Sequence, residues 1–198
     1  MKATTTDIDG VLILEPTLFE DSRGYFFESF NATTFRELTG IETTFVQDNE
    51  SMSSYGVLRG LHFQKPPYAQ SKLVRCVKGN VLDVAVDIRK GSPTYGKWVW
   101  CELSEDNHKQ FFVPKGFAHG FCVISDIAVF QYKCDEFWNK EAEGALRWDD
   151  PDIDVKWPVE YEDIILSDKD KNNVLLKDFD SPFDYNVDYY KRIDRLEL

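Results

Sequence analysis

Two of the three histidines in the chain lie close to glycine in short apolar segments. His62 follows Gly60 in the segment Arg59–Gln64, and His119 directly precedes Gly120. Histidine can exchange a proton near neutral pH, and a glycine in a strand lets backbone or a ligand approach closely. The pattern favours a chemical site over two histidines that are simply hydrogen-bonded within a sheet.

The residues around His62 set a geometric condition. Arg59 supplies a cation and Gln64 an amide in the same predicted strand, a combination that a core strand rarely needs. Strict alternation sends Arg59 and His62 to opposite faces of that strand. Gly60 must therefore break the pleat if both side chains are to contact one ligand.

A metal centre is the alternative use of the two histidines. Iron and manganese sites in jelly-roll proteins often use two histidines and a carboxylate, usually with a close histidine pair. Gln64 stands two residues after His62, so that close pair is missing. His62, His119 and one carboxylate remain an alternative ligand set, but we predict no metal and no other cofactor.

Tyr132 and two arginines are further candidates for the site. A phenol with an ordinary pKa of about 10 is an acid at neutral pH, so Tyr132 suits proton delivery to a carbon face opposite a histidine. The alternative is a purely structural role, in which Tyr132 is a half-buried aromatic ring with its hydroxyl at the rim of the core. Arg23 and Arg59 each precede a glycine and are the best candidates for holding phosphate, which arginine binds bidentately.

Short strands with alternating polarity dominate the chain. They are predicted over Val11–Glu15, Gly24–Phe30, Glu42–Asn49, Val57–Gln64, Ser71–Val77, Asn80–Arg89, Lys97–Ser104, Gln110–Pro114, Gly120–Ser125 and Ala128–Phe137. The clearest strand has one apolar face, made of Leu82, Val84, Val86 and Ile88, and a second face made of Asp83, Ala85 and Asp87. Many short strands without long crossovers predict an all-β sandwich or barrel.

Helical signals are few. Asn31 is predicted to cap a short helix over Thr33–Leu38 that Gly40 ends. The segment Ser167–Asp170 resembles a capping box that starts a second helix, so the Asp170 carboxylate also has a plain structural explanation. The acidic and aromatic tail after Asn172 is predicted to wrap over the surface.

Composition narrows the class of protein. The 198 residues fit one domain, 1–198, with a substantial core. The net charge of −12 argues against nonspecific nucleic-acid binding. No apolar run approaches the roughly 18 residues that span a bilayer, and no segment has the pattern of a signal peptide. None of the four cysteines forms a C-x-x-C pair, so we predict that they are buried, reduced thiols. The acidity and the lack of a long apolar run predict a cytoplasmic protein without membrane contacts.

With these residues in place, the chain resembles the dTDP-4-dehydrorhamnose 3,5-epimerase family, nucleotide-sugar epimerases of the cupin type. The resemblance covers residues 9 to about 170 and leaves the tail 172–198 uncovered. It is carried by the segments Leu14–Pro16, Asp21–Phe26, Phe45–Asn49, Gly56–Gln64, Asp83–Asp87, Pro114–Phe121, Trp148–Pro151 and Leu166–Asp170. It implies a double-stranded β-helix, or jelly roll, with a few short helices mainly towards the C-terminus.

The resemblance also implies roles for individual residues. His62 would remove a proton next to a keto group, Asp170 would hold and polarise His62, and Tyr132 would return a proton from the other side. Lys72 would stabilise the enolate oxygen, and the ring of Trp138 would stack on thymine. The nucleotide sugar would be held by Arg23, Glu28, Gln47, Asp48, Asn49, Arg59, His119, Glu143 and Lys169.

The family binds a dTDP-sugar without metal or cofactor, and its members are homodimers that exchange N-terminal strands. The implied reaction converts dTDP-4-dehydro-6-deoxy-D-glucose into dTDP-4-dehydro-L-rhamnose. Three alternatives stay open: epimerisation at C3 alone, a metal-dependent cupin enzyme, and a non-catalytic sugar-binding jelly roll. The sequence sets neither the pathway that uses the product nor the role of residues 172–198.

Overall fold

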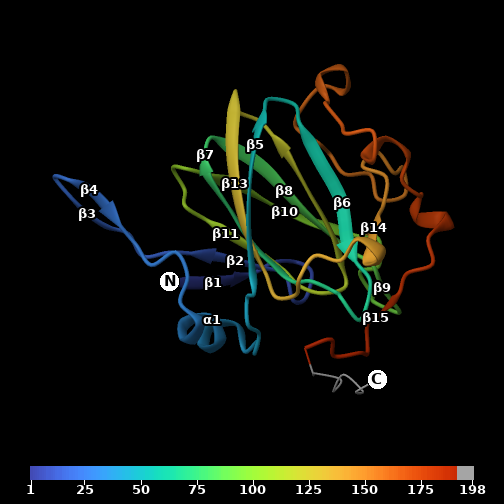
Figure 1. Cartoon of the computed structure of the whole chain (residues 1–198), viewed down its shortest axis with the longest axis horizontal. Helices are drawn as coiled ribbons and strands as arrows, with labels where there is room; N and C mark the ends of the chain where they lie inside the picture. Colours follow the sequence, from blue (N-terminus) through green and yellow to red (C-terminus); the bar gives the residue numbers. More distant parts are fainter. Residues whose placement is uncertain (191–198) are drawn as a thin grey trace.

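The computed structural model describes residues 1–190, and two antiparallel sheets dominate that range (Figure 1). The six-stranded sheet has the order β1 (Lys2–Thr5), β2 (Leu12–Glu15), β11 (Gln110–Val113), β7 (Lys72–Lys78), β13 (Ile127–Cys134) and β5 (Gln47–Ser54). The five-stranded sheet has the order β10 (Trp98–Ser104), β8 (Asn80–Asp87), β12 (Phe117–Val123), β6 (Leu58–Gln64) and β14 (Glu143–Ala145). One apolar core joins their inner faces, and the predicted all-β jelly roll is confirmed.

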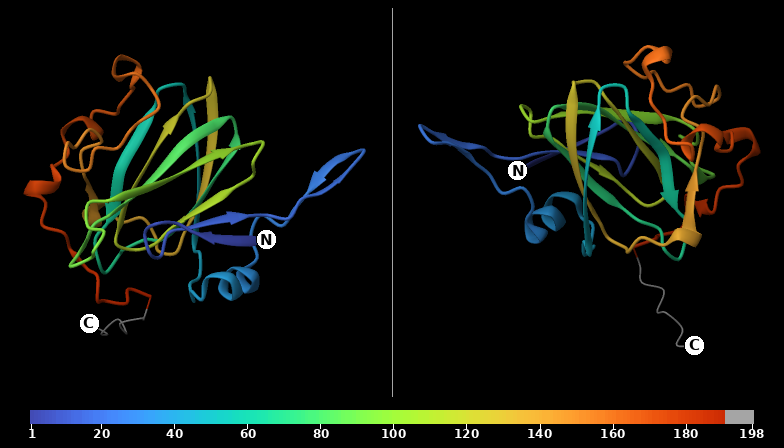
Figure 2. Two further views of the ribbon diagram at one scale, coloured as in Figure 1. Left: turned by 180° about the vertical axis from the view of Figure 1, so that it is seen from behind. Right: turned by 45° about the horizontal axis from the view of Figure 1, so that its top comes forward.

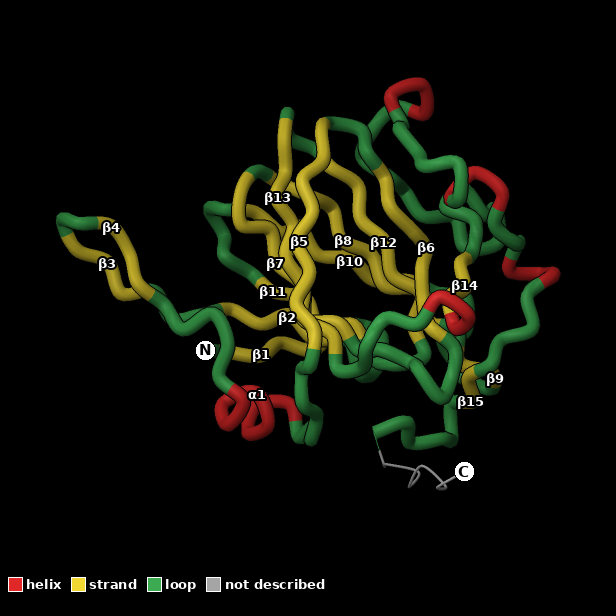
Figure 3. The backbone as a smooth tube through the Cα atoms, viewed as in Figure 1, coloured by secondary structure: helices red, strands yellow, loops and turns green. Residues whose placement is uncertain are grey.

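Shorter elements surround the two sheets. β3 (Phe19–Asp21) and β4 (Gly24–Phe26) form a hairpin that projects away from the barrel in Figure 1. β9 (Arg89–Lys90) pairs in parallel with β15 (Phe183–Asp184). One α-helix, α1 (Ala32–Thr39), occurs within residues 1–190. The 3₁₀ turns η1 (Lys140–Ala142), η2 (Tyr161–Asp163), η3 (Asp170–Asn172) and η4 (Leu176–Asp178) lie outside the sheets (Figure 3).

The two helix predictions have different outcomes. Asn31 caps α1 as predicted, because its Oδ1 accepts hydrogen bonds from the backbone of the first turn, and Gly40 ends the helix with φ of 70°. The second predicted helix is wrong. Ser167 Oγ bonds both the carboxylate and the backbone N–H of Asp170, but only the single turn η3 follows. The Asp170 carboxylate pairs with His62 and does not cap a longer helix.

β8 shows why the strands pack in two layers. Val84 and Val86, on its predicted apolar face, pack outward against residues such as Phe183 of the C-terminal part. Val81 and Ala85, on the opposite face, lie in the core between the sheets. The strand is therefore buried on both sides, and its acidic residues need buried partners.

The space between the sheets changes character along its length. On β7, the inward side chains run from Lys72 to the buried Val74 and Cys76. On β13, Tyr132 is only partly buried, whereas Phe130 is 1% exposed. Alternation places these residues on the same face of each strand. One end of the interior is thus apolar, and the other, the polar end, carries groups that can act on a ligand.

Several strand boundaries differ from the predictions. β5 starts at Gln47 and not at Glu42, and β12 begins at Phe117 and so includes His119. The predicted wrapping of the tail is confirmed as far as the structure describes it: the C-terminal part covers the outer face of the five-stranded sheet (Figure 2). The rest of that prediction falls on residues 191–198, which lie outside the described part.

Candidate active site

Two adjoining cavities of about 160 and 270 Å³ lie at the polar end of the interior. Both are lined by His62, Lys72, Tyr132 and Lys169. The first is also lined by Gln47, Asn49, Gln64, Gln70, Trp138 and Glu143, and the second by Ser51, Arg59, His119, Phe130, Ser167 and Asp170. Since His62 lies on the five-stranded sheet and Lys72 and Tyr132 lie on the six-stranded sheet, reactive groups face the cavities from two sides.

A bulge in β6 brings Arg59 and His62 to the same cavity. His62 pairs with His119 on β12, yet Arg59 pairs with Phe121, so three steps on β6 match two on β12. Gly60 provides the break: its φ is 146°, and a Cβ added at this position would lie 2.6 Å from the Cα of Gly120. The predicted break in the pleat is confirmed, and its reason is the close approach of the two backbones.

His62 forms a tight pair with Asp170. Its Nε2 lies 2.5 Å from Asp170 Oδ1, and Ser167 Oγ donates to Oδ2 of the same carboxylate at 2.9 Å. Burial opposes ionisation of Asp170, but these hydrogen bonds and the charge of His62 outweigh it and lower the pKa. Because an ionised carboxylate only accepts, Nε2 is the ring nitrogen that donates to Asp170, and in the neutral imidazole Nδ1 is the nitrogen that can act as a base.

His119 has a partner that the sequence did not reveal. Its Nε2 lies 2.9 and 3.1 Å from the two carboxylate oxygens of Asp83 on the neighbouring strand β8. Desolvation raises the pKa of Asp83 and lowers the pKa of His119. Alternation along β8 places Asp83 on the face opposite the apolar one. This is the only feature of the sequence that could have indicated Asp83 as a partner of His119.

Tyr132 and Lys72 face His62 from the other sheet. Burial raises the pKa of Tyr132, so the phenol keeps its proton, and burial lowers the pKa of Lys72 despite nearby acidic groups. Lys72 Nζ lies 5.9 Å from the centre of the Tyr132 ring. The site therefore holds a base on one sheet, with an acid and a cation on the other.

Trp138 and its neighbours form one wall of the first cavity. Trp138 Nε1 donates to Glu143 Oε1 at 3.0 Å, and Lys169 Nζ lies 2.5 Å from Glu143 Oε2. The Trp138 backbone N–H donates to Gln47 Oε1 at 3.0 Å. Trp138 as a whole residue is 57% exposed, which leaves its ring open to stacking on a flat ligand.

Gln64 supports this wall from behind. Its Nε2 donates to the carbonyls of Tyr68 and Phe137 at 2.7 and 3.2 Å, and its Oε1 accepts from Asn139 N at 2.7 Å. The residue in the place of a second metal-binding histidine thus fixes the chain on both sides of Trp138. The sequence identified Gln64 as an unusual amide in the strand of His62, but it did not indicate that this amide bonds to the backbone around Trp138.

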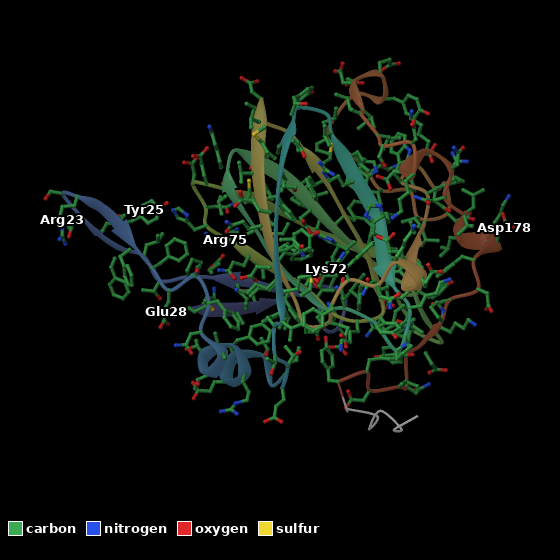
Figure 4. The ribbon with its side chains drawn as sticks, in the orientation of Figure 1. Arg23, Tyr25, Glu28, Lys72, Arg75 and Asp178 are labelled. Atoms are coloured by element: carbon green, nitrogen blue, oxygen red, sulfur yellow. The ribbon has the colours of Figure 1, made fainter. Side chains whose placement is uncertain are left out.

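Three predicted binding residues lie away from both cavities. Arg23 pairs with Asp21 at the tip of the projecting hairpin, and Glu28 lies further along the same arm (Figure 4). Asp48 points outward and pairs with Lys133, because its neighbours Gln47 and Asn49 take the inward positions of β5. Within one chain, only these three of the predicted site residues lie outside the cavities.

Within residues 1–190, no group of three or more His, Cys, Asp and Glu side chains is placed to hold a metal ion. No helix in that same range is long and apolar enough to cross a membrane. All four cysteines are buried free thiols, as predicted.

A jelly roll with an imidazole, a phenol and an ammonium group around one polar opening defines a cupin-type protein with an acid–base site. A family model described as dTDP-4-dehydrorhamnose 3,5-epimerase matches residues 5–178. The chain belongs to this family, and the resemblance drawn from its motifs is confirmed.

Individual relatives agree with the family assignment. The dTDP-4-dehydrorhamnose 3,5-epimerase of Shigella flexneri is 54% identical over 180 residues, which cover 91% of this chain and 98% of the relative. The crystal structure of the enzyme of that name from Elizabethkingia anophelis has a TM-score of 0.87 at 55% identity and covers 90% and 97% of the two chains. A Legionella pneumophila epimerase solved with dTDP-4-keto-L-rhamnose has a TM-score of 0.87 at 49% identity, over 90% and 94% of the chains.

Proposed function

We propose that this protein inverts C3 and C5 of dTDP-4-dehydro-6-deoxy-D-glucose and so forms dTDP-4-dehydro-L-rhamnose. The observation that carries the proposal is the placement of His62 opposite Tyr132 and Lys72 around one opening. Family membership supports the choice of substrate, since a relative of 49% identity was solved with dTDP-4-keto-L-rhamnose.

The chemistry needs groups on two sides of the sugar ring. C3 and C5 both neighbour the C4 carbonyl, so removal of either proton gives an enolate whose charge rests on oxygen. Inversion requires a base on one face and an acid on the other. His62 takes the proton through its free ring nitrogen, and Tyr132 returns one from the opposite sheet.

The two charged groups serve these steps. Lys72 lies where it can stabilise the enolate oxygen, and losing one such group commonly costs about 3–4 kcal/mol of barrier. Asp170 fixes the tautomer of His62 and stabilises the imidazolium that forms. The proposed cycle uses no cofactor, because the proton acceptor, the proton donor and the cation are all side chains of the protein.

The nucleotide is proposed to lie against the Trp138 wall, with Gln47, Asn49, Glu143 and Lys169 near it. Arg59 and His119 line the second cavity and are proposed to hold the polar parts of the sugar nucleotide. We also propose a cytoplasmic location, in keeping with four free cysteines.

Arg23 and Glu28 are proposed to act in the site of a second copy of the chain. The hairpin that carries Arg23 exposes Phe19, Tyr25 and Phe26 to 64%, 58% and 69%, and an exposed apolar patch of this kind often marks a protein–protein contact. A homodimer that exchanges these arms would cover them and deliver both charged residues.

Proton NMR in heavy water tests the reaction. Incubation with dTDP-4-dehydro-6-deoxy-D-glucose should place deuterium at C3 and at C5 of the product. Label at C3 alone would change the proposal to a 3-epimerase, and no label at either carbon would refute an epimerase. Turnover that survives His62→Ala unchanged would refute the assigned base.

Mixing two inactive variants tests the shared site. Arg23→Ala lacks the arm contribution and His62→Asn lacks the base, so each alone should be nearly inactive. A mixed dimer contains one site with both groups, so random exchange should restore about a quarter of the activity. No recovery after subunit exchange, verified by mass spectrometry, would show that the arm does not act across a dimer.

A further inference from the structure

The segment 179–190 lies beyond the family match, which ends at residue 178. It leaves η4, forms β15 and then runs along the lower end of the barrel in Figure 1, where it is drawn in red. The proposed reaction gives this segment no role. Its contacts nevertheless lead to the strand that carries Lys72.

Buried contacts dock the first part of the segment. Ser181 Oγ donates a hydrogen bond to the carbonyl of Ile88. Phe183 is 2% exposed and meets the ring of Tyr189 edge-on, with 5.3 Å between ring centres. The Tyr189 hydroxyl accepts from Asp184 N at 2.7 Å. The chain is therefore held in a defined course up to its last described residues.

Tyr190 then reaches the start of β7. Its hydroxyl lies 2.8 Å from Ser71 Oγ and accepts from Lys115 N at 3.4 Å. Lys115 Nζ lies 5.3 Å from the centre of the ring. Burial raises the pKa of Tyr190, so the phenol stays neutral and retains its proton for hydrogen bonding.

Ser71 is held from a second side as well. Its backbone N–H donates to Asp135 Oδ1 at 2.6 Å, and the other oxygen of that carboxylate lies 3.3 Å from Lys115 Nζ. Ser71 is 0% exposed. The end of β13, the segment before β12 and the C-terminal segment thus converge on one buried serine.

Ser71 directly precedes Lys72, and successive strand side chains point to opposite sides. Ser71 accordingly faces Tyr190 while Lys72 faces the cavities. Within residues 1–190 the Lys72 ammonium group forms no ion pair, and its Nζ lies 5.9 Å from the centre of the Tyr132 ring. The direction of Lys72 therefore depends on where the backbone at residues 71 and 72 is fixed.

We propose that Tyr190 is a positioning residue for Lys72, which it orients by holding Ser71 from outside the barrel. This inference rests on the proposed function, in which Lys72 stabilises the enolate. The C-terminal segment would then fix, from the outer surface of the barrel, the position of the lysine that contacts the reacting oxygen.

Two adjacent tyrosines provide a matched test. Tyr190→Phe removes the hydroxyl that bonds Ser71, whereas Tyr189→Phe removes a hydroxyl that bonds only within the segment. Tyr190→Phe should lower kcat by about three- to tenfold, the value of one hydrogen bond, with KM changed by less than about twofold. Ser71→Ala should reproduce this effect, and Tyr189→Phe should leave both constants unchanged.

Equal kinetics in the two tyrosine variants would overturn the inference while leaving the epimerase assignment intact. A second measurement does not depend on turnover. Amide hydrogen exchange at Ser71 and Lys72 should be faster in Tyr190→Phe than in Tyr189→Phe under native conditions. Unchanged exchange would also overturn the inference, even if the wild-type protein proved to have no epimerase activity.

Discussion

His62 and His119 form two histidine–aspartate pairs on neighbouring strands, and the pairs differ in their surroundings. The imidazole Nε2 lies 2.5 Å from Asp170 in one pair and 2.9 Å from Asp83 in the other. The side chain of His62 is 34% exposed, whereas that of His119 is 8% exposed. A ligand in the opening therefore has much freer access to the first imidazole.

The two carboxylates extend the contrast. Asp83 comes from a strand of the same sheet, and its burial raises its pKa. Asp170 comes from a turn packed over the sheet; burial also acts on it, but hydrogen bonds from His62 and Ser167 lower its pKa. A buried pair resists any change of net charge. The His62–Asp170 pair is thus suited to proton transfer, whereas the His119–Asp83 pair is suited to holding a ligand in place.

Removing each imidazole should give the largest difference between the pairs. His62→Asn should lower kcat by about 10²- to 10⁴-fold, the usual contribution of a general base. His119→Asn should mainly raise KM, since His119 lines the second cavity but its side chain is largely buried and burial lowers its pKa. Steady-state kinetics with the dTDP-sugar distinguish these outcomes. A larger loss of kcat in His119→Asn would reverse the assigned roles.

Changing the carboxylates should give the next largest effect. Asp170→Asn should lower kcat by about 10- to 100-fold, because a hydrogen bond to a charged group contributes about 1.5–3 kcal/mol. Asp83→Asn should act mainly on folding and lower the free energy of unfolding by about 1–3 kcal/mol. Turnover and urea unfolding of both variants measure this division. Similar kcat values in the two variants would remove the functional contrast.

The pH dependence of stability should have opposite signs for the two carboxylates. The lowered pKa of Asp170 means that its ionised form stabilises the fold above about pH 4, and this contribution is lost as pH falls through the folded pKa. The raised pKa of Asp83 means that its protonated form is favoured in the fold, so stability is lost as pH rises through that pKa.

Urea unfolding between pH 3 and 7 measures both contributions. Relative to the wild type, Asp170→Asn should show a smaller gain in the free energy of unfolding as pH rises from 3. Asp83→Asn should show a smaller loss over the range above about pH 4. Equal slopes for the two variants would mean that the surroundings of the pairs do not differ as described.

Much of the fold was predictable because local patterns agreed with the tertiary packing. The alternation in β8 marked a strand, and Asn31 and Gly40 marked both ends of α1. The capping box at Ser167 was misleading because the same hydrogen bonds that start a helix also hold a carboxylate for His62. Local sequence could not reveal that a partner 108 residues away competes for it.

The residues that line the cavities were predictable to a similar extent. Every predicted catalytic residue lines at least one cavity, and the break at Gly60 followed from the conflict between Arg59 and strict alternation. Asp83 was missed because pairing between β8 and β12 is a long-range property of the sheet. Local patterns around Arg23 and Glu28 do not indicate where their arm lies, and within a single chain the arm projects away from the cavities.

Ser167→Ala should give the smallest effect and the finest test of the contrast. Ser167 Oγ donates to Asp170 Oδ2 at 2.9 Å, much as Ser92 Oγ donates to the buried Asp87 at 2.6 Å, a pair that lines neither cavity. Each substitution removes one hydroxyl from a carboxylate, worth about 1 kcal/mol. Both should lower the free energy of unfolding, but only Ser167→Ala should also lower kcat, by about two- to tenfold. An equal loss of kcat in Ser92→Ala would mean that turnover falls with overall stability. The hydrogen bond from Ser167 to Asp170 would then have no specific effect on the His62 pair.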